Sequence, residues 1–222
     1  MVAVGLGPEI GAGGLLAAVD HLLYATPDLQ AGIERVERML GVRATAGGQH
    51  QGNGTRNALI SLGPEAYLEI IGPDPDQRPP AQPRLFGIDD LEEPRLVTWA
   101  ARGKALEQLV IEAGRRGVKL GEVIAGSRLR ADGVALSWRY TDPRTVVASG
   151  LVPFYIDWGT TPHPAATAAQ GASLVGVRAE HPDAASVAET LSRLGLDLPV
   201  TRGPGAALIA TVRSPRGLVE LR

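Results

Sequence analysis

Val19-Asp20-His21-Leu22-Leu23-Tyr24 and Tyr67-Leu68-Glu69-Ile70-Ile71 are the two stretches that decide the fold of this chain. Each is a short apolar run with the length and composition of a buried strand. Each also carries one residue, His21 or Glu69, that is able to bind a metal ion or to move a proton. We therefore expect two buried strands that bring a histidine and a carboxylate into one fold.

The segment between these stretches predicts one helix and two further strands. Thr26, which precedes a proline, is predicted as the helix N-cap. Residues 42–45 are predicted as a strand, and the glycine-rich residues 47–54 as a polar loop that leads into a strand at 56–62. The apolar positions at helical spacing are Leu29, Ile33, Val36 and Leu40.

The order of one strand, one helix and two or three strands recurs twice more along the chain. This predicts an α+β fold of repeated βαβββ units that form a cupped mixed sheet with helices on its outer face. Tyr67-Leu68-Glu69-Ile70 aligns with Tyr155-Ile156-Asp157-Trp158, so a carboxylate is expected at the same position of two strands. The expected organisation is a flexible leader (1–14), a first unit (15–72), a connector (73–94), a second unit (95–159), a connector (160–171) and a third βαβββ-like unit (172–222).

Composition removes several classes of function. The net charge of −2 comes from interleaved acids and bases, so we expect neither a nucleic-acid partner nor a membrane partner. The chain has no cysteine, which excludes disulfides, thiolate zinc sites and a cysteine nucleophile. The N-terminal stretch lacks the features of a signal peptide, which predicts a cytoplasmic protein.

The chain resembles the vicinal oxygen chelate superfamily and, within it, the glyoxalase-like domain proteins of the glyoxalase, bleomycin resistance and dioxygenase type. The motifs that carry the resemblance are Asp20-His21-Leu22, Thr26-Pro27-Asp28-Leu29, Gly47-Gly48-Gln49-His50, Gly54-Thr55-Arg56-Asn57, Tyr67-Leu68-Glu69-Ile70-Ile71-Gly72, Pro153-Phe154-Tyr155-Ile156-Asp157-Trp158-Gly159 and Pro162-His163-Pro164. They extend over most of the chain from Leu16 onward.

The resemblance implies a divalent metal ion (Zn, Fe, Mn or Ni) in the cup. It places His21, Glu69 and Asp157 as metal ligands, with Glu69 also as the catalytic residue. The first strand of the second unit offers Val97, Thr98 or Trp99 where the superfamily supplies another histidine, which is a departure from the pattern. Glu220, near the end of the third unit, is a lower-ranked ligand.

A second group of residues is expected to bind substrate. Each of them also has a structural explanation: residues 47–57 are able to form only a flexible hairpin loop, a histidine between two prolines is often part of a rigid connector, and an aromatic residue often packs in the core. Tyr155 and Asp157 share a strand face that is able to point to solvent, and His21 itself is able to be a buried histidine satisfied by a backbone carbonyl. The expected substrate-binding residues are His50, Arg56, Asn57, Tyr67, Trp99, Tyr155 and His163. Of these, His50 and His163 are also alternative metal ligands.

The leading hypothesis is a metal-dependent enzyme that acts on a small oxygenated metabolite, either as a lyase or isomerase or as a dioxygenase. The alternative is a metal-free protein that binds or sequesters a small molecule in the same cup. A third hypothesis gives the unpaired third unit a role in forming a homodimer.

Overall fold

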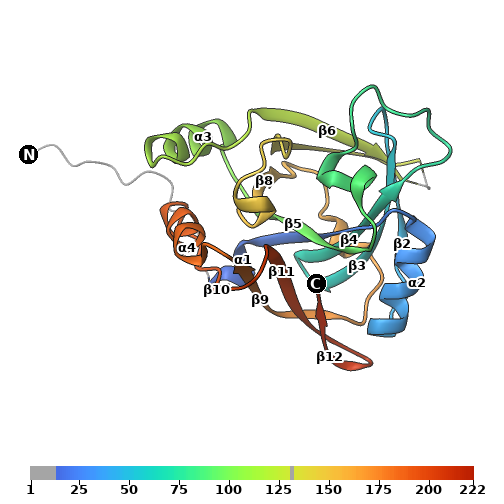
Figure 1. Cartoon of the computed structure of the whole chain (residues 1–222). Coiled ribbons are helices and arrows are strands. Elements are labelled where there is room, and N and C mark those ends of the chain that lie inside the picture. Colours follow the sequence, from blue (N-terminus) through green and yellow to red (C-terminus); the bar gives the residue numbers. More distant parts are fainter. Residues whose placement is uncertain (1–13, 131–132) are drawn as a thin grey trace, which may run out of the picture.

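The first two thirds of the chain form a closed barrel in the computed structural model, which describes residues 14–130 and 133–222 (Figure 1). The strands follow the order β1-β4-β3-β2-β6-β7-β8-β5, and β1 pairs with β5 to close the barrel. They are β1 (Val19–Ala25), β2 (Thr45–His50), β3 (Thr55–Gly63), β4 (Ala66–Pro73), β5 (Arg95–Arg102), β6 (Val123–Leu129), β7 (Ala135–Thr141) and β8 (Phe154–Asp157).

The last third of the chain forms a separate mixed sheet in the order β10-β9-β11-β12. Its strands are β9 (Ser173–His181), β10 (Val200–Arg202), β11 (Ala207–Ser214) and β12 (Gly217–Leu221). The sheet packs on the outside of the barrel, with β11 against β5 and β9 against β3. The third unit therefore covers the barrel and is not one of its walls.

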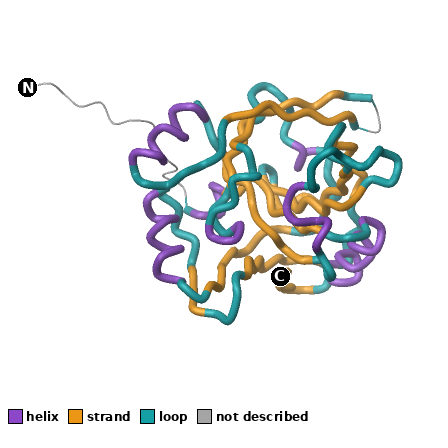
Figure 2. Tube along the Cα trace, turned by 45° about the horizontal axis from the view of Figure 1, so that its top comes forward, coloured by secondary structure: helices purple, strands orange, loops and turns teal. Residues whose placement is uncertain are grey.

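The helices lie around the strands, at the periphery of the molecule (Figure 2). They are α1 (Leu15–Ala18), α2 (Leu29–Leu40), α3 (Leu106–Arg115) and α4 (Ala184–Arg193), with short 3₁₀ turns η1 (Leu85–Asp90), η2 (Ala148–Gly150) and η3 (Pro164–Ala166). Strand, helix and three strands occur in this order three times, and the predicted α+β fold with a curled mixed sheet is confirmed.

Helix α2 illustrates how the sequence pattern produces an outer helix. It buries Leu29, Val36 and Leu40 against the barrel, as the periodicity predicts. The N-cap prediction is wrong by two residues, because the carboxylate of Asp28, and not Thr26, accepts the hydrogen bond from the Ala31 N–H at 3.0 Å. Thr26 is fully buried and its hydroxyl donates to the Asp28 carbonyl, so it shapes the turn before the helix.

Strand β2 lies where a loop was expected. It starts at Thr45 and continues through Gly48 to His50, opposite residues 55–59 of β3. The glycines in this stretch allow close packing and do not produce a loop. A Cβ at Gly47 would overlap the side chain of Asn57, and one at Gly48 would lie 2.5 Å from the carbonyl oxygen of Leu129. Side chains are excluded there because β6 and the Asn57 amide approach so closely.

One apolar core joins all parts of the fold. It includes Leu22 and Trp99 of the barrel together with Val177, Leu191 and Leu208 of the last third. The three-unit division stays a prediction because the units share this core. Residues 1–13 of the expected leader lie outside the described residues. No helix in the described part of the chain is long and apolar enough to span a membrane.

Candidate active site inside the barrel

Two parallel strands bring the key residues together at the inner surface of the barrel. His21 of β1 lies opposite Tyr67 of β4, and side chains of a strand alternate between its faces. His21, Tyr67 and Glu69 therefore all face the interior, where they line a cavity of about 60 Å³ that we call the Glu69 pocket. Its other walls include Leu23, His50, Thr55, Asn57, Arg128, Trp138, Tyr140, Phe154, Ile156 and Trp158.

Glu69 is a buried carboxylate, 6% exposed, between two imidazoles. His21 Nε2 lies 3.5 Å from Glu69 Oε2, and His50 Nε2 lies 3.7 Å from Glu69 Oε1. The Asn57 amide donates to Oε1 at 2.7 Å. A buried carboxylate requires such hydrogen-bonding partners to offset its desolvation. The arrangement places a base and two proton-carrying rings within one small volume.

Asn57 is itself oriented from the far side of the barrel. Arg128 of β6, a buried side chain, donates from Nη1 to Asn57 Oδ1 at 2.9 Å. This bond assigns the amide oxygen to Arg128 and leaves the amide nitrogen facing Glu69. The second unit therefore orients the Glu69 carboxylate indirectly, through the Arg128–Asn57 contact.

Asp20 supports His21 from behind. Its Oδ1 lies 2.7 Å from His21 Nδ1, and its Oδ2 lies 3.2 Å from His163 Nε2 and from Trp158 Nε1. Adjacent strand residues normally point to opposite faces, but a register shift between Val19 and His21 in the β1–β5 pairing turns Asp20 toward the same site. Because Nδ1 of His21 is hydrogen-bonded to Asp20 Oδ1, the Nε2 atom of the same ring is the one that faces Glu69.

The protonation states of the pocket follow from burial and charge. Burial would raise the pKa of Asp20, but hydrogen bonds from His163 and His21 hold this pKa well below its ordinary value of 3.8. Burial lowers the pKa of His50, although Glu69 opposes this effect. Burial, followed by the Glu69 and Asp20 carboxylates, raises the pKa of Tyr67 well above its ordinary value. Near neutral pH, Asp20 is ionised, His50 is neutral and the Tyr67 phenol keeps its proton.

Aromatic side chains form most of the remaining wall. His21 stacks on Tyr67 with ring centroids 4.6 Å apart, and Phe154 meets the His21 ring edge-on. Trp138 and Trp158 pack against each other at 5.2 Å. The pocket combines a few convergent polar groups with an apolar lining, which is the usual composition of a small-molecule site.

Asp157 is not brought to His21 and Glu69. Phe154, Ile156 and Trp158 of the same segment line the pocket, so Asp157 points outward, where it forms an ion pair with Lys104 at 2.7 Å. The residue-by-residue alignment of β4 with β8 is therefore wrong by one position, and in a strand one position reverses every side chain.

The strand register shows which residues occupy the equivalent positions in the second unit. His21 lies opposite Ala100, Tyr67 pairs with His21, and Phe154 pairs with Ala100. Ile156 accordingly takes the place that Glu69 has in the first unit. The position of the expected second histidine is Ala100, and not Val97, Thr98 or Trp99, so the second unit offers two apolar side chains where the superfamily places ligands.

The structure separates the expected substrate-binding residues into two groups. The first group lines the pocket and consists of His50, Asn57 and Tyr67. His163 lies behind the pocket, where its Nε2 is 3.2 Å from Oδ2 of Asp20. The other residues lie elsewhere in the described structure: Arg56 pairs with the exposed Asp76 and the buried Asp74, and Trp99 and Tyr155 are in the apolar core. Glu220, the lower-ranked metal ligand, pairs with Arg178 on β9.

Three determinants of the site did not follow from the sequence, namely Asp20, Arg128 and Ala100. The adjacent Asp20-His21 pair was a signal, since two polar residues in one apolar strand require partners. Arg128 lies near the end of β6 and is distant in sequence from Asn57, so only the barrel closure places it. No local pattern identifies Ala100.

A known protein family matches most of this chain. The family model described as "Glyoxalase-like domain" matches residues 19–195. The chain belongs to the glyoxalase-like domain family. It is thereby a member of the vicinal oxygen chelate superfamily, as the sequence motifs predicted.

The fold of this glyoxalase-like protein is similar to that of a solved structure. A hypothetical protein from Staphylococcus aureus superposes with a TM-score of 0.68 at 12% identity, covering 90% of this chain and 92% of that one. Methylmalonyl-CoA epimerase from Mycobacterium tuberculosis gives a TM-score of 0.45 at 20% identity, covering 68% of this chain and 94% of that one. No curated protein matches the sequence. The first likeness supports the fold alone.

Replacement of Asp20 by asparagine is expected to destabilise the protein by about 2 kcal/mol at neutral pH, because the His21 and His163 nitrogens lose a charged acceptor. The folded pKa of Asp20 is depressed, so its stabilisation is present above the unfolded pKa, near pH 4, and is lost as pH falls through the folded pKa. Urea unfolding between pH 3 and pH 7 measures this. Wild type should lose more stability on acidification than Asp20→Asn, with Asp76→Asn as the exposed control; parallel pH curves would contradict the prediction.

Replacement of Gly47 by alanine tests the Asn57–Glu69 contact without changing either residue. The new methyl group would overlap the Asn57 side chain and lie 2.5 Å from Arg128 Nη1, so Asn57 must move away from Glu69. We expect a loss of about 1–3 kcal/mol in unfolding free energy, measured by urea denaturation. Gly176→Ala is the matched control, since no atom of the described residues lies within 4 Å of its added carbon. Equal stabilities of the two variants would argue against the close packing of β2.

Proposed function

We propose that this protein is an enzyme that transfers a proton to or from a small oxygenated substrate, in the manner of an isomerase or lyase, with Glu69 as the base. The observation that carries the proposal is the buried Glu69 carboxylate, which faces His21 Nε2 at 3.5 Å and His50 Nε2 at 3.7 Å. A base must lie within reach of the proton that it abstracts and of the group that receives it next.

The neighbouring side chains suit the individual steps of such a transfer. Glu69 takes a proton from a carbon next to a carbonyl, and His21, held by Asp20, exchanges a proton with the same carboxylate. The phenol of Tyr67, whose raised pKa keeps it protonated, is able to donate a hydrogen bond to the substrate oxygen as negative charge develops there. The aromatic walls keep water away from the reacting carbon.

A divalent ion at this site stays a prediction. Its ligands would be Glu69, His21 Nε2 and His50 Nε2, a set of one carboxylate and two imidazoles that many metal ions accept. As arranged, however, no group of three or more such side chains in the described part of the chain is able to hold an ion. The Asn57 amide donates into Glu69 Oε1 and lies 3.4 Å from His50 Nε2. The proposed proton transfer therefore uses only side chains of the protein, and dioxygenase chemistry depends on the predicted ion.

Sequestration of a ligand is the weaker explanation of the pocket. It accounts for the aromatic walls, but it gives no use to a buried carboxylate between two imidazoles, which is expensive to desolvate. We propose that the enzyme is cytoplasmic. The homodimer also stays a prediction, and light scattering of the purified chain checks it.

Solvent deuterium exchange tests the proposed function. Small carbonyl compounds with an acidic neighbouring C–H are incubated with untagged protein in D₂O and followed by NMR. Catalysed exchange that survives in an Arg115→Gln control, a change at an exposed residue that pairs with Glu112, supports the proposal; exchange no faster than in buffer for every compound contradicts it. Elemental analysis of the same preparation, and exchange after chelation and metal addition, separately check the predicted ion.

A further inference from the structure

A second, much larger cavity adjoins the Glu69 pocket. It has a volume of about 970 Å³ and lies between β5, the turns η1 and η2, and the β10–β11 connection of the third unit. Leu85, Phe86 and Phe154 line both cavities, so the two are neighbours with a shared apolar wall. Since the Glu69 pocket has room for only a few water molecules, most of any sizeable substrate must lie outside it.

The larger cavity is lined by basic side chains. Arg35, Arg84, Arg95, Arg144 and Arg222 contribute to its wall, and no acidic side chain does so among the described residues. We call it the arginine cleft. A cleft lined by one sign of charge concentrates ligands of the opposite sign. This charge is local, because the whole chain carries only −2.

Two of these arginines have no carboxylate partner among the residues that the structure describes. Arg35, Arg84 and Arg222 form ion pairs with Glu93, Asp89 and Glu180 respectively. The guanidinium of Arg144 donates to the carbonyl of Pro83, and that of Arg95 has no hydrogen bond or ion pair with any described residue. The cleft therefore keeps about two positive charges that are not neutralised within the protein.

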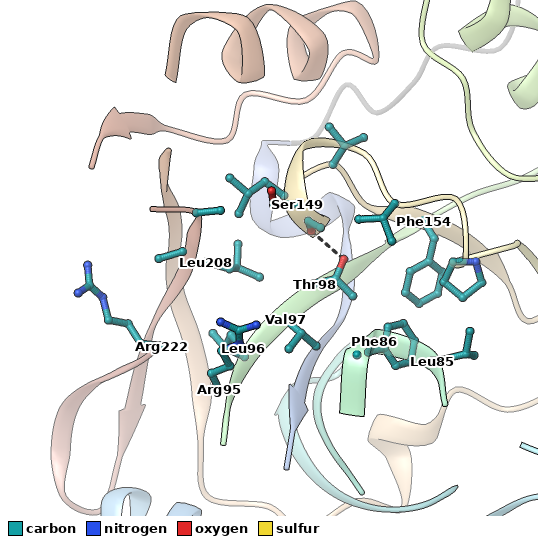
Figure 3. A pocket seen from close by; sticks show the side chains of 18 of the residues that line it. Leu85, Phe86, Arg95, Leu96, Val97, Thr98, Ser149, Phe154, Leu208 and Arg222 are labelled. Carbon is teal, nitrogen blue, oxygen red and sulfur yellow. Dashed lines mark hydrogen bonds between the residues drawn. The ribbon is translucent and has the colours of Figure 1, made fainter. Parts of the chain in front are cut away.

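The two ends of the cleft differ in character. Figure 3 shows Arg95 and Arg222 on one side and Phe86, Leu85 and Phe154 on the other, with Val97 and Thr98 of β5 between them. Arg95 is thus separated from the Glu69 pocket by an apolar stretch, whereas Arg84 and Arg144 lie near Leu85, because Arg144 donates to the Pro83 carbonyl. An elongated ligand with an anionic end and an apolar middle matches this order.

Strained backbone lies on the rim of the same cleft. Phe86 has φ 64° and Ser149 has φ 55°, values that are unusual for residues with a side chain. Both residues line the cleft, on η1 and η2. Strain of this kind persists where the surroundings fix it and is concentrated at ligand sites. The Thr98 hydroxyl donates to the Gly150 carbonyl at 2.8 Å, which holds η2 against β5.

We propose that the arginine cleft binds the phosphate-bearing end of an elongated substrate whose oxygenated end occupies the Glu69 pocket. A phosphate carries nearly two negative charges, and its oxygens accept paired hydrogen bonds from a guanidinium group such as that of Arg95, which pairs with no carboxylate among the described residues. The phosphate site stands on the cleft alone, and its link to a substrate rests on the proposed function.

Calorimetric titration of the full chain with sodium pyrophosphate, at ionic strength held constant with NaCl, tests the proposal. We expect saturable binding that weakens about tenfold or more in Arg95→Gln, and by less in Arg144→Gln, whose guanidinium also donates to the Pro83 carbonyl. Arg115→Gln is the matched control, because it removes the same charge from an exposed residue of α3 that pairs with Glu112 outside the cleft. Succinate, a dicarboxylate of similar charge, should bind more weakly than pyrophosphate.

The outcomes separate this proposal from the proposed function. Glu69→Gln should bind pyrophosphate as wild type does, since Glu69 does not line the cleft. Binding of pyrophosphate without any catalysed deuterium exchange would retain the phosphate site and remove the proton-transfer role. Absence of saturable binding, equal weakening in Arg115→Gln, or tighter binding of succinate would each overturn the phosphate site.

Discussion

Glu69→Gln should lower the rate of catalysed proton exchange by about 10²–10⁴-fold, the usual contribution of a positioned acid or base. Glutamine keeps the size of the side chain and the hydrogen bond from the Asn57 amide to Oε1, but it is unable to accept the substrate proton. The measurement is the rate of deuterium incorporation into a substrate found by the NMR screen, over a range of substrate concentrations.

Two controls make the Glu69 result specific. Glu65→Gln makes the same chemical change in an exposed carboxylate, 75% accessible, that pairs with Arg102, and should leave the rate unchanged. Urea unfolding of Glu69→Gln must show that the variant is folded at the assay temperature. A folded variant with the wild-type exchange rate would remove Glu69 from the role of base and would leave His21 as the group to test.

Trp99→Ala should have the largest effect on stability, a loss of about 3–5 kcal/mol. Trp99 is fully buried in the main apolar core, and its indole N–H donates to the Leu151 carbonyl at 2.9 Å. Truncation leaves a cavity and an unpaired carbonyl, both of which destabilise the folded state. Urea unfolding of wild type and variant measures the difference.

Two further variants, Trp99→Phe and Trp138→Ala, separate the contributions of the hydrogen bond and of core burial to this loss of stability. Trp99→Phe keeps most of the apolar volume and should lose the smaller amount that belongs to the hydrogen bond. Trp138→Ala removes the same side chain from the partly exposed wall of the Glu69 pocket and should cost less than Trp99→Ala. A small loss in Trp99→Ala, together with weaker substrate binding, would restore the ligand role that the sequence suggested for this tryptophan.

The sequence predicts the repeated pattern well because that pattern is local. The spacing of Leu29, Val36 and Leu40 specifies an outer helix, and the apolar runs around His21 and Glu69 specify buried strands. Local pattern fails at residues 47–50, where glycines indicated a loop. There the need for glycine comes from β6 and Asn57, which pack against β2 from distant parts of the chain.

The residues of the candidate site were likewise predicted only in part from the sequence. His21 and Glu69 follow from the sequence, because a polar residue inside an apolar strand needs a partner and the two strands were expected in one unit. His50, Asn57 and Tyr67 were expected and lie in the pocket, whereas Trp99 and Tyr155 lie in the core. An aromatic side chain suits a pocket wall and a core equally, so composition is unable to separate the two.

The sequence alone determined the α+β class, the family and the strands that carry His21 and Glu69, since these depend on periodicity and on short motifs. Only the tertiary structure decided that Asp157 faces outward, that Ala100 and Ile156 take the equivalent positions of the second unit, and that Asp20 and Arg128 support the site. The physical reason is register: a shift of one residue in a strand reverses the direction of its side chains, and register is set by pairing between distant strands.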